Sequence, residues 1–193
     1  MDKGNHSFSP NPIESLFDLA KTISAVQFKH HMRVEDAEVS VATVASISAM
    51  PWTVQILIAG SDLEVMLRLH FSMDSAEKML ANRSADISVT QNLTLDLIRE
   101  LSNLISGRIK ALFESAGILM AQGLPFVLEG LTSESIFPLT EASTPTCIWS
   151  LRSKSVGQLI CSMTVVIENP SVIPIIANVS LDELPDTGEV ELF

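Results

Sequence analysis

Basic residues, cysteines and long apolar runs are all scarce in this sequence. Lysine and arginine number 12 against 23 aspartate and glutamate residues, so the formal net charge of the 193 residues is −11. Binding to the phosphates of a nucleic acid, or to an anionic membrane surface, needs a basic footprint. We therefore expect neither of these partners, and a protein or a small molecule remains.

The shortage of apolar runs argues against a membrane-spanning helix, because no stretch reaches the length needed to cross a bilayer. The N-terminal residues 1–11 are polar and lack the apolar region of a signal peptide, so we expect them to be flexible and the protein to be cytoplasmic. Cys147 and Cys161 lie in apolar, strand-like sequence, which predicts two buried thiols rather than a disulfide.

The sequence also has no glycine-rich phosphate loop, no cluster of metal ligands and no nucleophile–base pair, so we expect no metal or cofactor of its own. His30 and His31 are adjacent, and no carboxylate–histidine spacing accompanies them, which favours a solvated helix end over a metal site. His70 falls on the polar side of a predicted strand, and we interpret it as a surface histidine.

The hydrophobic residues, 47% of the chain, suffice for one sizeable core. Their spacing predicts helices over 12–27, 72–83 and 88–117, and strands over 37–48, 52–60, 63–71, 123–130, 146–153 and 156–167. We expect a bulge near Thr43, where the alternation of the first strand slips. This order of strands and helices indicates an α+β fold with helices packed on a sheet.

The C-terminal segment differs in character from the rest. From Glu168 onward the chain has six acidic residues and no basic one, which predicts an acidic C-terminal extension over 169–193. The extension either packs through its apolar groups at 172–176 and 190–193 or hangs free. It is a solvated tail or a docking peptide, and composition alone does not choose between them.

The longest segment with unbroken helical periodicity runs from about Ser88 to Gly117. Ser88 and Gln91 are spaced for a capping box, and Gly117 is suited to a left-handed stop. One apolar stripe follows the segment and is predicted to face the core: Leu97, Ile98, Leu101, Leu104, Ile105, Ile109, Leu112 and Ala116.

A second row of residues follows the opposite face of this helix: Asp96, Glu100, Asn103, Gly107, Lys110 and Glu114. Glu100 and Asn103 lie one turn apart, and Gly107 lets another surface approach the backbone. A carboxylate, a carboxamide and an open patch together predict a docking face that carries chemistry. A simple solvated face is the alternative, because a Glu-x-x-Asn pair arises easily by chance.

The row resembles the CheX-type chemotaxis phosphatases of the CheC/CheX family. The match rests on Glu100-Leu-Ser-Asn103-Leu-Ile-Ser-Gly107 and on the later Gly123-Leu-Pro125-Phe-Val-Leu-Glu-Gly130, together with the order of elements over 12–168. The resemblance implies a pseudo-symmetric α+β domain over 12–168, with two long helices packed on an antiparallel β-sheet. It also implies a homodimer built through sheet edges.

The resemblance further implies a protein phosphatase that hydrolyses the aspartyl phosphate of a CheY-like receiver domain. Glu100 would form a salt bridge with the receiver's lysine, and Asn103 would enter the receiver's active site and orient the attacking water. Asp96, Gly107 and Lys110 would contact the partner. The receiver would supply Mg²⁺, which accords with a chain that has no metal site of its own.

A non-catalytic interaction module on the same fold, like the flagellar-switch relatives, is the alternative. The sequence has a single Glu-x-x-Asn: in the helix predicted over 72–83, Glu77 is followed by Leu80. That helix is therefore expected to be inactive.

Overall fold

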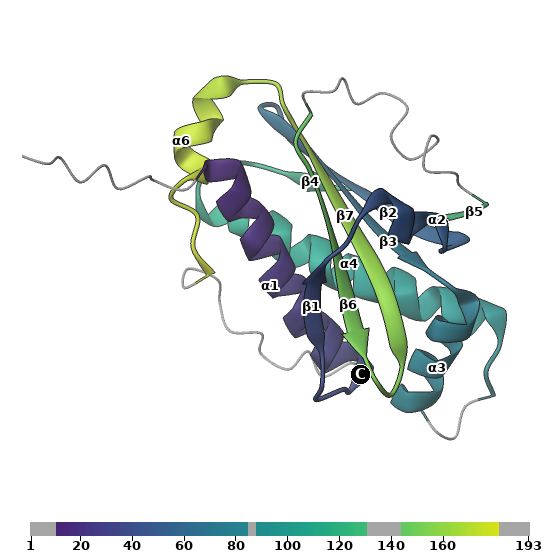
Figure 1. Cartoon of the computed structure of the whole chain (residues 1–193). Coiled ribbons are helices and arrows are strands. Elements are labelled where there is room, and N and C mark those ends of the chain that lie inside the picture. Colours follow the sequence, from purple (N-terminus) through teal and green to yellow (C-terminus); the bar gives the residue numbers. More distant parts are fainter. Residues whose placement is uncertain (1–10, 85–87, 131–143, 182–193) are drawn as a thin grey trace, which may run out of the picture.

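The computed structural model describes residues 11–84, 88–130 and 144–181. Two predictions lie outside the described residues: the flexible N-terminal segment 1–11, of which only residue 11 is described, and the packing of the apolar residues 190–193. Figure 1 shows a sheet with the long helices packed on one of its faces. Within the described part of the chain, no helix is long and apolar enough to cross a membrane.

The sheet has seven strands in the order β1-β6-β7-β3-β2-β4, with β5 also paired to β2, and every pairing is antiparallel. The strands are β1 (Glu38–Val41), β2 (Trp52–Ala59), β3 (Leu63–Phe71), β4 (Ala121–Gln122), β5 (Phe126–Glu129), β6 (Thr146–Ser153) and β7 (Gly157–Ile167). The predicted α+β class and the antiparallel sheet are confirmed.

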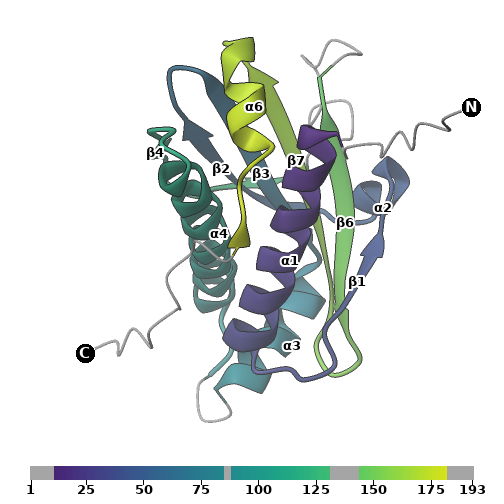
Figure 2. The ribbon, with the colours of Figure 1, turned by 90° about the vertical axis from the view of Figure 1, so that its left-hand side faces the viewer.

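The strand pairings show the pseudo-symmetry that the resemblance implies. Two hairpins, β2–β3 and β6–β7, meet at the centre of the sheet through the β3–β7 pair. Each hairpin takes its outer strand from the other half of the chain, since β1 pairs with β6 and β5 pairs with β2. A long helix precedes each outer strand: α1 (Pro12–Met32) comes before β1, and α4 (Gln91–Ser115) comes before β5. The two helices lie side by side across one sheet face (Figure 2).

Helix α4 begins two residues later than a Ser88 cap would place it. Thr90 is the cap, and its hydroxyl accepts a hydrogen bond from the Leu93 backbone N–H at 3.4 Å, so the predicted Ser88–Gln91 capping box is wrong. The predicted stop is present, because Gly117 has φ +83°. The apolar stripe is buried except at its edges, where Leu104 is 38% exposed and Ala116 is partly buried.

The predicted strand over 37–48 is wrong in its second half. The chain forms β1 and then a short helix, α2 (Val44–Ser48). The alternation slips at Thr43, whose backbone N–H donates to the Ser46 hydroxyl at 3.3 Å and so begins a helical turn. The turn places Ile47 against Ile160 of β7, where both are buried.

The first part of the acidic extension packs on the domain. It forms a 3-10 turn, η1 (Pro170–Val172), followed by α6 (Ile173–Ile176), which contacts α1 (Figure 2). Val172 and Ile176 are buried. Both cysteines are free thiols, as predicted, but only Cys161 is buried, and Cys147 near the start of β6 is partly exposed.

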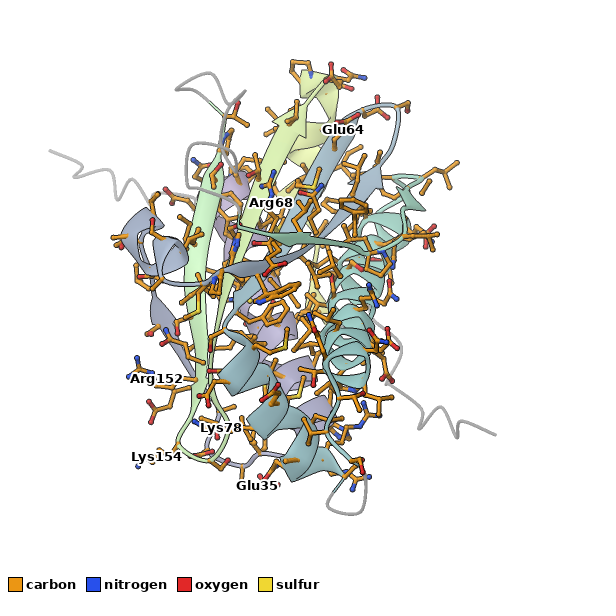
Figure 3. The ribbon with its side chains drawn as sticks, turned by 90° about the vertical axis from the view of Figure 1, so that its right-hand side faces the viewer. Glu35, Glu64, Arg68, Lys78, Arg152 and Lys154 are labelled. Carbon is orange, nitrogen blue, oxygen red and sulfur yellow. The ribbon has the colours of Figure 1, made fainter. Side chains whose placement is uncertain are left out.

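His70 is not a surface residue, so that interpretation of the sequence is wrong. Arg68, two residues earlier on β3, lies on the sheet face opposite α1 (Figure 3), and strand alternation places His70 on the same face, yet the exposure of His70 is 0%. The Thr53 and Ser162 hydroxyls each lie 2.9 Å from one of its ring nitrogens, and both strands that flank β3 supply these partners. Burial, with a smaller effect of the Arg68 charge, lowers the pKa of His70 to about 3.

The neutral, buried His70 predicts a loss of stability on acidification. Because its folded pKa lies far below the unfolded value, the unfolded state binds the additional proton as pH falls below about 6.5. Between pH 6.5 and 5 the free energy of unfolding of the wild type should therefore fall by about 1.5 kcal/mol more than that of His70→Gln. Urea unfolding of both proteins at these two pH values measures the difference. An equal fall in the free energy of unfolding for the two proteins would contradict the lowered pKa of His70.

Candidate functional site

The outward row of α4 occupies one helix face beyond the core. The apolar stripe binds the other face to the sheet, so the row cannot turn inward. Asn103 is exposed on this face, and Glu100, one turn earlier, is 43% exposed. The structure thus brings the predicted carboxylate and carboxamide together at the surface, with Gly107 one turn beyond Asn103.

Glu100 is not a free carboxylate, because side chains from two other helices contact it. Arg83, the last residue of α3 (Met73–Arg83), donates from Nη1 to Oε2 of Glu100 at 3.0 Å. His31, near the end of α1, has its Nε2 3.5 Å from the same oxygen. The three helices α1, α3 and α4 therefore converge at Glu100.

The interpretation of His30 and His31 as a solvated helix end is wrong for His31, whose side chain is only 7% exposed. Burial, and then the nearby Arg83 charge, hold the pKa of His31 below its usual range, although Glu100 acts in the opposite direction. A neutral ring can accept, and its Nε2 lies 2.9 Å from Nη1 of Arg83, which donates to it. The end of α1 is buried here because it packs on both α3 and α4.

Asn103 has a neighbour that the sequence does not indicate. Gln122 of β4 donates from Nε2 to Oδ1 of Asn103 at 3.4 Å, a long hydrogen bond. The same side chain lies over Gly107, where an added Cβ would be 3.6 Å from Oε1 of Gln122. Gly107 is therefore partly covered by this chain's own side chain, whereas the sequence predicts an open patch.

The remaining charged residues of the row are paired along the helix. Asp96 accepts from Arg99 at 2.6 Å, and Lys110 donates to Glu114 at 2.7 Å. Exposed pairs of this kind add little to stability. On either side of Glu100 and Asn103, the charges of the row are therefore neutralised by a partner on the same helix.

Exposed apolar residues also lie close to this row. Leu104 follows Asn103 directly, and the segment that carries Gln122 exposes Leu119 by 82% and Leu124 by 90%. Apolar groups of this size on a polar face are typical of a protein-binding surface when they cluster.

The chemistry that this arrangement can perform is limited to positioning. No group of three or more histidine, cysteine, aspartate or glutamate residues that could hold a metal occurs within the ranges that the structure describes. A carboxamide both donates and accepts hydrogen bonds but is no general base. The exposed carboxamide can therefore orient a water or a substrate group.

Several solved structures have the same fold as this chain. The chemotaxis protein CheX from Vibrio vulnificus matches with a TM-score of 0.59 at 13% identity, over 78% of this chain and 96% of that one. CheX in the CheX–CheY–BeF₃–Mg²⁺ complex from Borrelia burgdorferi matches with a TM-score of 0.57 at 13% identity, over 79% and 96%. The fold is CheC/CheX-like.

The fold is also shared by a protein named FliY. FliY from Thermotoga maritima matches with a TM-score of 0.54 at 13% identity, over 92% of this chain and 100% of that one. A scan of protein-family models and a search of curated proteins gave no match. At these identities the likeness establishes a CheC/CheX-like fold and leaves the activity to be argued from the site.

Gly107 gives a test of the space around this site. An alanine side chain there would make ordinary contact with Gln122, and alanine favours the helix by about 1 kcal/mol over glycine. We predict that Gly107→Ala raises the free energy of unfolding by roughly 0.5–1 kcal/mol. Gly117→Ala is the matched control: its φ of +83° makes the same substitution destabilising. Urea unfolding measures both, and a destabilised Gly107→Ala would show that Gln122 cannot give way.

Proposed function

We propose that this chain is a phosphatase that accelerates hydrolysis of the aspartyl phosphate of a CheY-like receiver domain in a two-component system. The observation that carries the proposal is the exposed Asn103 carboxamide one turn from Glu100 on α4 of a CheC/CheX-like fold. The Borrelia burgdorferi neighbour was solved in complex with CheY, which supports a receiver domain as the partner. We place the reaction in the cytoplasm.

Asn103 would act on the attacking water. Its exposed carboxamide can accept a hydrogen bond from a water and donate one to a phosphoryl oxygen at the same time. Phosphoryl transfer proceeds through a loose transition state, so that positioning and charge stabilisation contribute more than a strong base. The hydrogen bond from Gln122 would leave the second lone pair of Oδ1 for this water.

Glu100 would anchor the complex through a lysine of the receiver. Its carboxylate is half-exposed, so it can reach a cation on a docked partner. A charge-assisted contact that becomes buried on binding is worth more than one left in water. Asp96, Gly107 and Lys110, which lie along the same row, would border the contact, and Mg²⁺ would belong to the receiver.

The edges of the sheet offer a place for the homodimer that we also propose. Strand β1 pairs with β6 alone among the described strands, so its outer edge is open. Val39 and Val41 of β1 are 42% and 87% exposed. An open, apolar edge strand is a favourable site for pairing with a second chain.

A non-catalytic interaction module is the second candidate. The match to Thermotoga maritima FliY, which covers more of this chain than the CheX matches do, favours it. An exposed carboxamide beside a carboxylate held by Arg83 has no evident role in a purely structural module. We therefore rank the phosphatase first.

Substitutions at the two residues test the proposed roles by different kinetic signatures. Asn103→Ala should lower kcat for receiver dephosphorylation by about 100-fold, because the water loses its orientation. Glu100→Ala should instead raise KM by about tenfold with kcat little changed, as expected for the loss of a binding contact. The measurement is the rate of phosphate release from phosphorylated receivers of the same cell at several receiver concentrations.

Two matched controls lie away from Glu100 and Asn103. Asn92→Ala removes an exposed carboxamide two turns from Glu100, and Glu14→Ala removes an exposed carboxylate in the first turn of α1. Both should keep wild-type kinetics. An Asn103→Ala protein with wild-type kcat would remove Asn103 from the mechanism, and a wild type that binds receivers without accelerating any of them would favour the interaction module.

A further inference from the structure

The three-helix contact at Glu100 is a feature that the proposed roles do not explain. Arg83 is 26% exposed in its side chain, and its Nη1 donates both to Oε2 of Glu100 at 3.0 Å and to Nε2 of His31 at 2.9 Å. The guanidinium is thus held between a buried ring and the carboxylate. Arg83 therefore connects α3 to both α1 and α4.

The contact is directional. Arg83 and His31 both approach Oε2, so the described contacts of the carboxylate leave its other oxygen, Oε1, for a partner. A carboxylate has about four acceptor positions and can hold an arginine at one oxygen while a second cation binds the other. Because Nε2 of His31 accepts from Arg83, the arginine is the cation held against the carboxylate, and burial keeps the pKa of His31 below its usual range.

A free glutamate side chain at the surface samples many rotamers, and fixing it costs conformational entropy on binding. Arg83 fixes Glu100 before the partner arrives, which lowers that cost. Its charge also offsets that of Glu100. Without it, a bare carboxylate one helical turn from Asn103 would repel the anionic phosphoryl group that Asn103 has to reach.

We propose that Arg83 is a positioning residue for receiver binding: it holds Glu100 by Oε2 so that Oε1 faces the lysine of the receiver, and it shields the phosphoryl group from the Glu100 charge. This inference rests on the proposed phosphatase function. Arg83 itself takes no part in the reaction, and its effect passes through Glu100.

The test is receiver dephosphorylation by Arg83→Gln, with Arg83→Lys and the control Lys78→Gln beside it. Arg83→Gln should raise KM by about three- to tenfold and leave kcat within about twofold, because it weakens binding only. Arg83→Lys retains the charge and a donor but not the planar fork, so it should recover part of the lost affinity. Lys78→Gln removes the same charge from an exposed ion pair on α3, the helix that carries Arg83, and should change KM by less than about twofold.

A double substitution decides whether Arg83 acts through Glu100. In the Glu100→Ala background, Arg83→Gln should cause no further rise in KM, since the carboxylate that it positions is absent. Additive effects would overturn the inference. So would an Arg83→Gln protein whose KM is equal to or below that of the wild type, or a Lys78→Gln protein whose KM rises as much as that of Arg83→Gln. If the wild type accelerates no receiver, the proposed function fails and this inference falls with it. In every other case the proposed function stands, and only the role of Arg83 is decided.

Stability measurements separate this role from a loss of folding. Each variant should unfold cooperatively in urea, with Arg83→Lys close to the wild type. If Arg83→Gln is too unstable to assay, the KM of Arg83→Lys is compared with that of the wild type. The KM of the double variant Arg83→Lys/Glu100→Ala is then compared with that of Glu100→Ala. A KM for Arg83→Lys no higher than that of the wild type would then overturn the role of the planar fork.

Discussion

The packing of α4 on the sheet is the contact on which the candidate site depends. Ile98, Leu101 and Ile105 are fully buried beneath the helix, and they fix its rotation about its own axis. Because α-helical faces are set by residue spacing, burying this stripe forces Glu100 and Asn103 to point away from the sheet. The site is therefore a consequence of core packing, and no loop has to order to form it.

The two side chains of the site are held in different ways, which matches the roles proposed for them. Glu100 is held by a hydrogen bond from Arg83, beside the His31 ring, at a point where α1, α3 and α4 meet. Among the described residues, the Asn103 carboxamide has only the long hydrogen bond with Gln122 and is otherwise exposed. An anchoring group gains from being fixed before binding. A group that enters another protein's active site has to project and keep its hydrogen-bonding capacity.

Local patterns in the sequence predicted the fold well, and long-range contacts explain what they missed. The strands at 52–59 and 63–71 follow from alternation, and the long helices follow from periodicity, because both patterns depend on near neighbours. His31, His70 and Gln122 could not be placed from sequence. Each is positioned by an element distant in the chain: His31 by α3 and α4, His70 by β2 and β7, and Gln122 by α4. The site residues on α4 were predictable only because one helix carries both.

The most direct test of the account is turnover of a phosphorylated receiver by substoichiometric amounts of this protein. The phosphorylated receiver and Mg²⁺ are supplied in excess, and inorganic phosphate is followed with time. The account predicts that phosphate release continues through many turnovers, at a rate proportional to the amount of protein added. Release that is unchanged by the protein, or that stops once each protein molecule has bound one receiver, would contradict catalysis and leave the fold as a binding module.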